Sequence, residues 1–288
     1  MTTTDGRGEG GGLLWLGAAL TLVCWALAWS PLALPVSQYT FFPLWLGYVA
    51  LVNGLAERYF ADSLLRRLGP RFSTLFLASV PFWWVFERLN TIVRNWVYVF
   101  ARPVSDLQYV VEASIDFSTV VPAVTSTVYF VRLAMAERAV AVSGPALRVG
   151  RAGLAAMAAG GALCLLTVVL WPTIAFPLVW IAPFLLLEPP LHVLGLPTVL
   201  RRAQDGDWSL VAAIVLATTA NGFVWELWNF YSSPKWIYTV PYVGFCKIFE
   251  MPILGYFGYP FFGLIVFDYA IMVHAALFGR EAARDLTP

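Results

Sequence analysis

Four glutamates stand out among the residues that could do chemistry. Glu87 and Glu226 end apolar stretches of the sequence, and Glu112 and Glu250 begin the apolar stretches that follow. A carboxylate at the centre of a bilayer helix costs about 2.5 to 3.5 kcal/mol, so such groups are interpreted first as functional. Burial and like-charge neighbours keep one carboxyl protonated as an acid while another stabilises a cation. The four glutamates are therefore the predicted catalytic groups.

Amide and aromatic side chains accompany these glutamates. An asparagine follows Glu87 and Glu226 by three residues, about one helical turn, and could hydrogen-bond the carboxyl. Segments 91–107 and 231–249 combine Trp, Tyr and Phe with Arg and Lys, which is typical of a membrane interface or a re-entrant lid. Aromatic faces stabilise a cation by about 0.5 to 2 kcal/mol each. The predicted substrate-binding residues are Asn90, Asn229, Trp96, Tyr98, Trp225, Trp236 and Tyr238.

The glutamates also have a purely structural interpretation. They could pair with Arg88, Arg94, Lys235 and Lys247, within an aromatic belt whose cations extend to the interface. The sequence alone leaves both interpretations open.

Further acidic residues lie in the apolar stretches. Glu188 precedes Pro189 and Pro190, which predicts a break in the helix there, or a simple kink. Asp116 and Asp268 are expected deeper in the membrane, where either could pair across the bundle.

The sequence predicts no cofactor. His192 and His274 both fall toward the inner ends of their predicted helices, so a haem or a metal held by them is the alternative. Cys24, Cys164 and Cys246 are widely spaced, which excludes a disulfide framework and a Cys-rich zinc site.

The composition is that of a polytopic membrane protein. Of 288 residues, 60% are hydrophobic and 12% are charged, and the net charge of +1 excludes nucleic-acid binding as the main function. A span needs about 20 mainly apolar residues. The sequence predicts an all-α integral membrane fold with eight transmembrane helices, at residues 13–31, 40–57, 71–90, 108–134, 152–172, 175–197, 208–230 and 250–277.

Basic residues predict the orientation. With the N-terminus inside, thirteen of the 18 Lys and Arg fall on the inner side, where positive charge is retained. Both termini are expected in the cytoplasm, and segments 91–107 and 231–249 on the outer side of a bacterial inner membrane. Residues 1–12 are interpreted as a disordered leader.

The chain also carries signs of an internal duplication. Phe42-Pro43 and Phe176-Pro177 each precede an arginine pair, Arg66-Arg67 and Arg201-Arg202. The Glu87 and Glu226 segments share Glu, Asn, Trp and Tyr in the same order, and Glu112 and Glu250 each precede a proline by ten residues. Four ordered matches favour duplication over convergent membrane composition.

The duplication predicts two tandem four-helix repeats. An even number of spans makes the copies parallel, related by an axis along the membrane normal. This would place Glu87 opposite Glu226 and Glu112 opposite Glu250. The predicted units are repeat 1 at 13–136, a cytoplasmic linker at 137–151, repeat 2 at 152–279 and a tail at 280–288.

The C-terminal motif resembles small integral-membrane carotenoid enzymes, the lycopene cyclases of the heterodimeric type and the carotenoid hydratases. The resemblance rests on Glu226, Trp236-x-Tyr238 and the run from Glu250-Met251-Pro252 to Gly258-Tyr259-Pro260-Phe261, about fifty residues. The adjacent-carboxylate proline motif of the cyclases has Glu188-Pro189-Pro190 as its nearest counterpart. The resemblance implies protonation of an isoprenoid double bond without a cofactor.

Three functions therefore remain open. The first is an enzyme that cyclises, hydrates or isomerises an isoprenoid lipid or carotenoid by carboxylate acid catalysis. The second is a non-catalytic subunit that binds a lipid or pigment in a membrane complex, and the third is a proton-coupled transporter. The expected partners are a hydrophobic isoprenoid or lipid ligand, membrane lipids, and a membrane protein or second copy of the chain.

Overall fold

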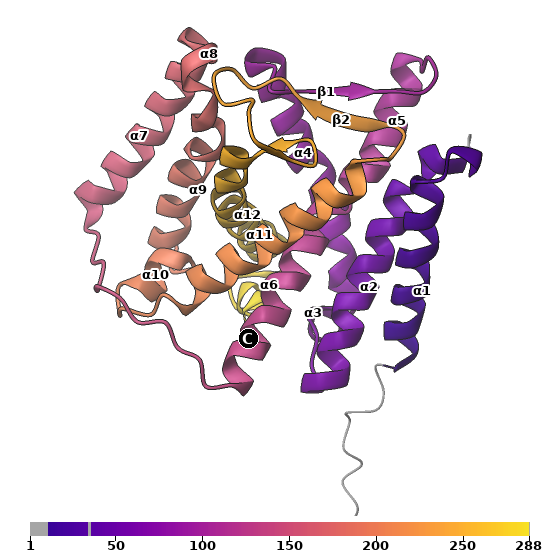
Figure 1. The fold of residues 1–288 in the computed structure, drawn as a ribbon. Coiled ribbons are helices and arrows are strands. Elements are labelled where there is room, and N and C mark those ends of the chain that lie inside the picture. The colour runs from indigo at the N-terminus through magenta and orange to yellow at the C-terminus, as the bar shows by residue number, and fades with distance from the viewer. Residues whose placement is uncertain (1–10, 34–35, 288) are drawn as a thin grey trace, which may run out of the picture.

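The computed structural model describes residues 11–33 and 36–287, and this part of the chain is mostly helical (Figure 1). Six helical segments are long and apolar enough to cross a membrane, which confirms six of the predicted spans. They are α1 (Gly11–Ala28), α5 with α6 (Asp106–Glu137), α7 (Arg151–Leu170), the Pro172–Val193 segment, α11 (Ser209–Asn229) and the Ile253–Phe278 segment.

Helices α2 (Phe41–Phe60) and α4 (Ser73–Val93) occupy the other two predicted positions. Their 20 and 21 residues are long enough to cross at about 1.5 Å per residue. Both carry a Glu-Arg pair near the C-terminal end, and Pro81 interrupts the hydrogen-bond ladder of α4. Whether they span the membrane stays a prediction.

The element order is similar in the two halves of the chain. Two long helical segments are followed by a short helix, a long helix, a strand and a final helical segment. The remaining elements of the first half are η2 (Pro31–Ala33), η3 (Val36–Tyr39), α3 (Leu64–Leu68), η4 (Gly69–Phe72), β1 (Trp96–Val99), α5 (Asp106–Phe117) and α6 (Val120–Glu137). Those of the second half are α8 (Pro172–Ala175), η5 (Phe176–Trp180), α9 (Ala182–Val193), α10 (Val199–Ala203), β2 (Lys235–Tyr238), β3 (Lys247–Ile248), β4 (Met251–Pro252), η6 (Ile253–Phe257), α12 (Gly258–Phe278) and η7 (Ala282–Leu286).

Two short sheets correct the prediction of an all-α fold. β1 and β2 pair antiparallel, with Trp96 opposite Tyr238 and Tyr98 opposite Trp236, and β3 pairs with β4. The β1–β2 pair lies at the upper end of the bundle in Figure 1, away from the C-terminus. Strands of four residues leave too little alternation to detect, and each has its partner in the other half of the chain.

The segment predicted as one helix at 108–134 is broken between α5 and α6. Ser79 of α4 joins the two pieces: its hydroxyl donates to the Phe117 carbonyl at 2.5 Å and accepts the Val121 N–H at 3.0 Å. The side chain thus satisfies backbone groups that the break leaves without helical partners.

The double proline does not break the helix as predicted. α9 continues through Pro189 and Pro190 and ends at Val193. Two prolines remove two backbone hydrogen-bond donors from the helix. Leu191 and Ala182 are nevertheless buried, so α9 packs against its neighbours. Tertiary packing therefore outweighs the local preference.

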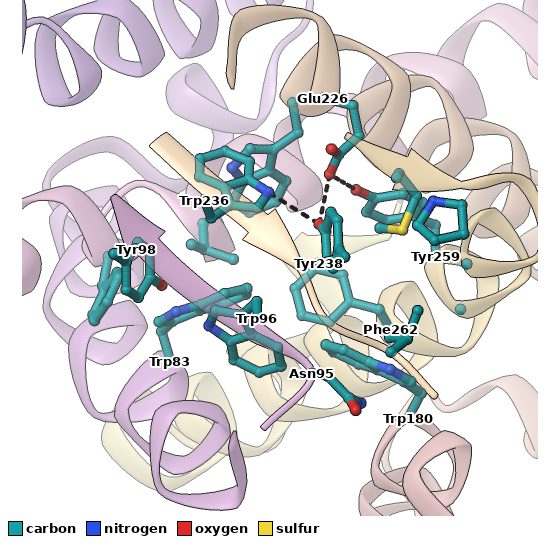
Figure 2. A pocket seen from close by; sticks show the side chains of 18 of the residues that line it. Trp83, Asn95, Trp96, Tyr98, Trp180, Glu226, Trp236, Tyr238, Tyr259 and Phe262 are labelled. Atoms are coloured by element: carbon teal, nitrogen blue, oxygen red, sulfur yellow. Dashed lines mark hydrogen bonds between the residues drawn. The ribbon is translucent and has the colours of Figure 1, made fainter. Parts of the chain in front are cut away.

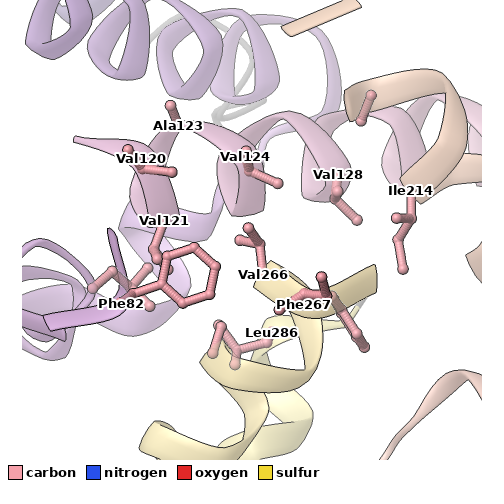
Figure 3. Packing of buried hydrophobic residues seen from close by; sticks show 14 of the residues in the cluster. Phe82, Val120, Val121, Ala123, Val124, Val128, Ile214, Val266, Phe267 and Leu286 are labelled. Atoms are coloured by element: carbon pink, nitrogen blue, oxygen red, sulfur yellow. The ribbon is translucent and has the colours of Figure 1, made fainter. Parts of the chain in front are cut away.

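The core lies between α6, α11 and α12 (Figure 3). Val120, Val124 and Val128 of α6 face Val266 of α12 and Ile214 of α11, all nearly inaccessible to solvent. Small β-branched side chains allow these helices to approach closely, which fixes the frame that carries the polar residues.

The ends of the chain differ from the sequence prediction. The predicted tail at 280–288 contains η7, where Ala283 and Leu286 are buried and Asp285 pairs with Arg71.

The predicted linker between the halves, at 137–151, is largely exposed and extended, and Ser143 forms an isolated bridge with Asp207. Most of the predicted leader lies outside the described residues.

Candidate active site

A cavity of about 380 Å³ lies against the β1–β2 pair. That volume is within the range of small-molecule sites, about 300 to 1,000 Å³. Most of its lining is aromatic or aliphatic, and three acidic residues reach it: Glu112, Asp116 and Glu226. Of the predicted substrate-binding residues, those that line it are Trp96, Tyr98, Trp225, Trp236 and Tyr238.

Glu226 is the most enclosed of these acids. Its side chain comes from the last turn of α11 and is 0% exposed. One carboxyl oxygen, Oε1, accepts the hydroxyls of Tyr238 at 2.7 Å and Tyr259 at 2.9 Å (Figure 2). The other oxygen, Oε2, is buried without a hydrogen-bond partner among the described residues. A proton on Oε2 would therefore be held by no protein acceptor and could pass to a ligand.

Tyr238 connects Glu226 to the strand pair. Its hydroxyl donates to Glu226 and accepts the indole N–H of Trp236 at 3.0 Å. Burial, followed by the charge of Glu226, raises the pKa of Tyr238 well above its ordinary value. The phenol stays protonated and acts as a hydrogen-bond donor to the carboxyl.

Indole and phenyl rings form the other walls of the cavity. Trp83 of α4 and Trp225 of α11 stack with ring centroids 5.8 Å apart, and Trp96 lies 6.1 Å from Trp180 of η5. Phe262 of α12 meets Trp83 edge to face at 5.9 Å. Such faces stabilise a positive charge in a site that offers few counter-ions.

Glu87, the first-half counterpart of Glu226 in the predicted repeat, does not line the cavity. Its Oε1 accepts Tyr98 at 2.6 Å, Trp83 at 3.0 Å and Trp96 at 3.2 Å. Burial and the Glu87 charge raise the pKa of Tyr98, so this tyrosine also stays a donor. The Oε1 of Glu87 thus holds three aromatic residues in place.

Glu112 and Asp116 reach the cavity from α5, four residues apart on one helical face. Glu112 accepts the amide of Gln108 at 2.8 Å. Asp116 lies near the backbone N–H of Phe42, in the first turn of α2. The cavity therefore has one acidic group on its α11 wall and two on its α5 wall.

Glu250 has a structural partner instead. Its carboxyl pairs with the Lys235 ammonium at 2.5 Å and does not line the cavity. The sequence placed it at the start of a helix, but α12 begins only at Gly258, because Pro252 and the glycines that follow disfavour a helix. Of the four predicted catalytic glutamates, the cavity brings in Glu226 and Glu112 only.

Asn90 and Asn229 hold the strands rather than the glutamates, contrary to prediction. The Asn90 amide donates to the Trp96 carbonyl and its Oδ1 accepts the Trp96 N–H, at 2.8 and 3.2 Å. Asn229 makes the same two bonds with Trp236, at 2.8 and 2.9 Å. A short turn brings each strand back over its helix. The backbone groups of the strand are therefore nearer to the asparagine side chain than the glutamate carboxyl is.

A second pair of acids is buried away from the cavity. Glu188 of α9 and Asp268 of α12 are both 0% exposed and lie close enough to interact electrostatically. Glu188 Oε1 also accepts the Leu200 N–H at 3.0 Å, capping α10. Asp268 thus lies beside a second acid on another helix, and both of its oxygens are buried without a hydrogen-bond partner among the described residues.

The two histidines lie apart from this cavity. His274 of α12 is 3.5 Å from the Thr74 hydroxyl, and His192 of α9 has its carbonyl bonded to Arg201. Within residues 11–33 and 36–287, no group of three or more His, Cys, Asp or Glu side chains could hold a metal ion.

Sequence reasoning missed several cavity residues. Asp116 was identified only as a deep acid, and Tyr259 only as part of a motif. Trp83, Trp180 and Phe262 were not predicted. Trp180 had a signal, because it closely follows Phe176-Pro177, but that motif was used only to predict the repeat. When most residues of a helix such as α4 are apolar, the sequence does not show which side of the helix faces the cavity.

The apolar helices define an integral membrane protein with an aromatic, acid-containing cavity. No protein-family model, curated protein or solved structure matches the chain.

Proposed function

We propose that the protein is a membrane enzyme that protonates a carbon–carbon double bond of an isoprenoid lipid, with Glu226 as the acid. The observation that carries the proposal is the state of the Glu226 carboxyl. One oxygen is fixed by two tyrosine hydroxyls, and the other is buried without a partner at the wall of an aromatic cavity.

The chemistry follows from this arrangement. The O–H bond of Glu226 breaks as a C–H bond forms, which leaves a carbocation on the isoprenoid and a carboxylate on the enzyme. The hydroxyls of Tyr238 and Tyr259 stabilise the carboxylate, and the faces of Trp83, Trp225 and Trp236 stabilise the cation. Cyclisation, hydration and double-bond isomerisation all pass through such a cation.

The experiment compares Glu226→Gln with the unmodified full-length protein in liposomes, using squalene and lycopene as linear probes. Gln keeps the volume and accepts the tyrosine hydroxyls but cannot deliver the proton. Product measured by chromatography should fall about 10² to 10⁴-fold, with the thermal midpoint nearly unchanged. Full activity of the variant would refute the proposed role of Glu226.

A non-catalytic binding subunit is the second candidate, favoured by the Lys235–Glu250 pair. There a predicted catalytic glutamate serves a structural ion pair, as the alternative sequence interpretation expected. In that case liposomes with the unmodified protein bind the probe without converting it, and Glu226→Gln alters binding or stability alone.

We also propose that the two halves are parallel tandem repeats. Besides the element order, three hydrogen-bonding arrangements occur once in each half: Asn to strand, Glu to strand tyrosine, and a side-chain cap on the short helix. An antiparallel strand pair in which Trp96 faces Tyr238 and Tyr98 faces Trp236 fits a two-fold axis between the halves.

The proposed orientation places the strand pair on the outer side. Cysteines introduced at Thr91 and Ser232 should react with an impermeant maleimide added to intact cells, and one at Ser143 should not. Labelling confined to Ser143 would reverse the orientation.

A further inference from the structure

The two buried acids outside the cavity have no positively charged partner. Glu188 and Asp268 are both 0% exposed, and neither lines the cavity beside the strand pair. None of the ion pairs formed within residues 11–33 and 36–287 includes either of them. Because a buried carboxylate without a partner is strongly unfavourable, the two acids must hold protons or bind a cation.

The hydroxyl of Thr198 is left without a partner at the same place. Thr198 is 0% exposed, lies beside the Glu188 carboxyl and directly precedes α10. A threonine in this position ordinarily accepts a backbone N–H of the first helical turn with its own oxygen. Here Glu188 accepts the Leu200 N–H at 3.0 Å instead, and Thr198 Oγ1 makes no hydrogen bond with any described residue.

A turn after α9 brings Thr198 back to Glu188. Gly195 adopts a φ of 77°, a conformation that favours glycine, and the Leu196 N–H donates to the Leu191 carbonyl at 3.1 Å. The two acids and the threonine therefore come from α9, from the segment after it and from α12. A ligand bound by all three would connect separate parts of the bundle.

The first half fills the matching positions with side chains that are fully partnered. Asn53 and Ser63 are placed around α3 as Glu188 and Thr198 are placed around α10. The Asn53 amide makes hydrogen bonds at 2.8, 2.9 and 3.0 Å, and the Ser63 hydroxyl makes them at 2.8 and 3.0 Å. The geometry of a capped short helix thus does not by itself leave oxygens without partners.

Four oxygens at the second-half position need a common partner: Glu188 Oε2, Asp268 Oδ1 and Oδ2, and Thr198 Oγ1. Protons alone would not satisfy them, because each added O–H is a donor that needs an acceptor, and none of the four makes a hydrogen bond with a described residue. A cation among them interacts with all four and offsets the negative charge of the acids.

The oxygens also indicate the kind of cation. Carboxylate and hydroxyl oxygens are ligands for hard cations. Ca²⁺ takes about 6 to 8 oxygens and Mg²⁺ keeps several waters, so four enclosed oxygens suit a small monovalent ion better. We infer that Glu188, Asp268 and Thr198 bind one sodium ion. This site is separate from Glu226, and it does not depend on the proposed reaction.

The test measures sodium binding directly. Full-length protein in detergent is equilibrated with radioactive sodium ions, with choline chloride keeping the ionic strength constant. The unmodified protein should retain close to one ion per chain. Sodium in large excess should also raise the thermal midpoint by about 3 to 8 °C relative to choline, because an ion that binds only the folded state stabilises it.

Variants then test the ligands. Thr198→Val keeps the shape and charge but removes one oxygen, so the sodium affinity should fall about tenfold or more. The matched control is Ser63→Ala, which removes the corresponding hydroxyl of the first half and should leave the sodium affinity unchanged. The double variant Glu188→Gln, Asp268→Asn removes the negative charge and should bind no sodium, although Gln still accepts the Leu200 N–H.

Three results would overturn the inference. Absence of sodium binding in the unmodified protein would assign the four oxygens to protons or water. Sodium affinity in Thr198→Val within about twofold of the unmodified protein, or binding that survives in the double variant, would place the ion elsewhere. Displacement of the bound sodium by an equal concentration of calcium would assign the site to a divalent ion. If the double variant does not fold, the unmodified protein and Thr198→Val decide the question.

Discussion

The two halves of the molecule solve the same structural problem with different side chains. In the first half, Asn53 of α2 accepts the Leu65 N–H at 2.9 Å and caps α3. In the second half, Glu188 of α9 accepts the Leu200 N–H at 3.0 Å and caps α10, again twelve residues later. The Asn53 amide also donates to Ser126 at 3.0 Å, whereas the second oxygen of Glu188 is buried beside Asp268 without a hydrogen-bond partner.

The same contrast holds at the other end of the bundle. Glu87 and Glu226 both accept a strand tyrosine, but of the two only Glu226 lines the cavity, where its Oε2 is buried without a hydrogen-bond partner. Hydrogen bonds that hold the fold therefore occur in both halves, whereas only one of these two glutamates is available for chemistry in the cavity.

The largest expected difference between the halves is catalytic. Glu226→Gln should lower conversion of the probes about 10² to 10⁴-fold, whereas Glu87→Gln should lower it far less. Gln at 87 still accepts a tyrosine hydroxyl, so the loss of activity should be about tenfold or less. Equal losses in the two variants would mean that both carboxyls act in catalysis and that the halves do not differ in function.

The next difference concerns stability at the two helix caps. Glu188→Ala leaves the buried Leu200 N–H without its acceptor and a cavity beside Asp268, and should cost about 2 to 5 kcal/mol in the free energy of unfolding. Asn53→Ala removes a neutral cap and should cost about 1 to 3 kcal/mol. Thermal unfolding in detergent measures both. A larger loss for Asn53→Ala would show that the acid pair is the weaker contact.

The smallest difference is expected at Asn90 and Asn229, whose side chains hydrogen-bond the two strands. Asn90→Ala and Asn229→Ala each remove hydrogen bonds to one strand, and each should destabilise the strand pair by about 1 to 3 kcal/mol. Amide hydrogen exchange at residues 96–99 and 235–238 reports the opening. Because the strands pair with each other, each variant should speed amide exchange in both strands. Faster exchange confined to one strand would show that Asn90 and Asn229 act separately.

Sequence patterns were most informative about helix positions and about which residues gather near the strands. Long uncharged stretches locate helices reliably, because hydrocarbon tolerates few charges. The partners of polar side chains were less predictable. Asn90 could reach either Glu87 or a backbone group, and the choice depends on how residues 94–95 turn.

Contacts between distant segments account for most of what the sequence did not reveal. Asp116 belongs to the cavity because α5 packs near the start of α2, and Trp180 because η5 packs on α12. The continuation of α9 through Pro189 and Pro190 depends likewise on its neighbours. Such contacts join residues far apart in the chain, and in a mostly apolar sequence few positions distinguish the inward face of a helix.

The pairing of β1 with β2 also fixes the order in which the protein can be completed during synthesis. Residues 96–99 leave the ribosome long before residues 235–238, and until then β1 is an edge strand without its partner. α11 must be made before the strand can close that wall. The cavity therefore closes late in synthesis, and a nascent chain that stops before Lys235 carries Glu87, Glu112, Asp116 and Glu226 but no enclosed site.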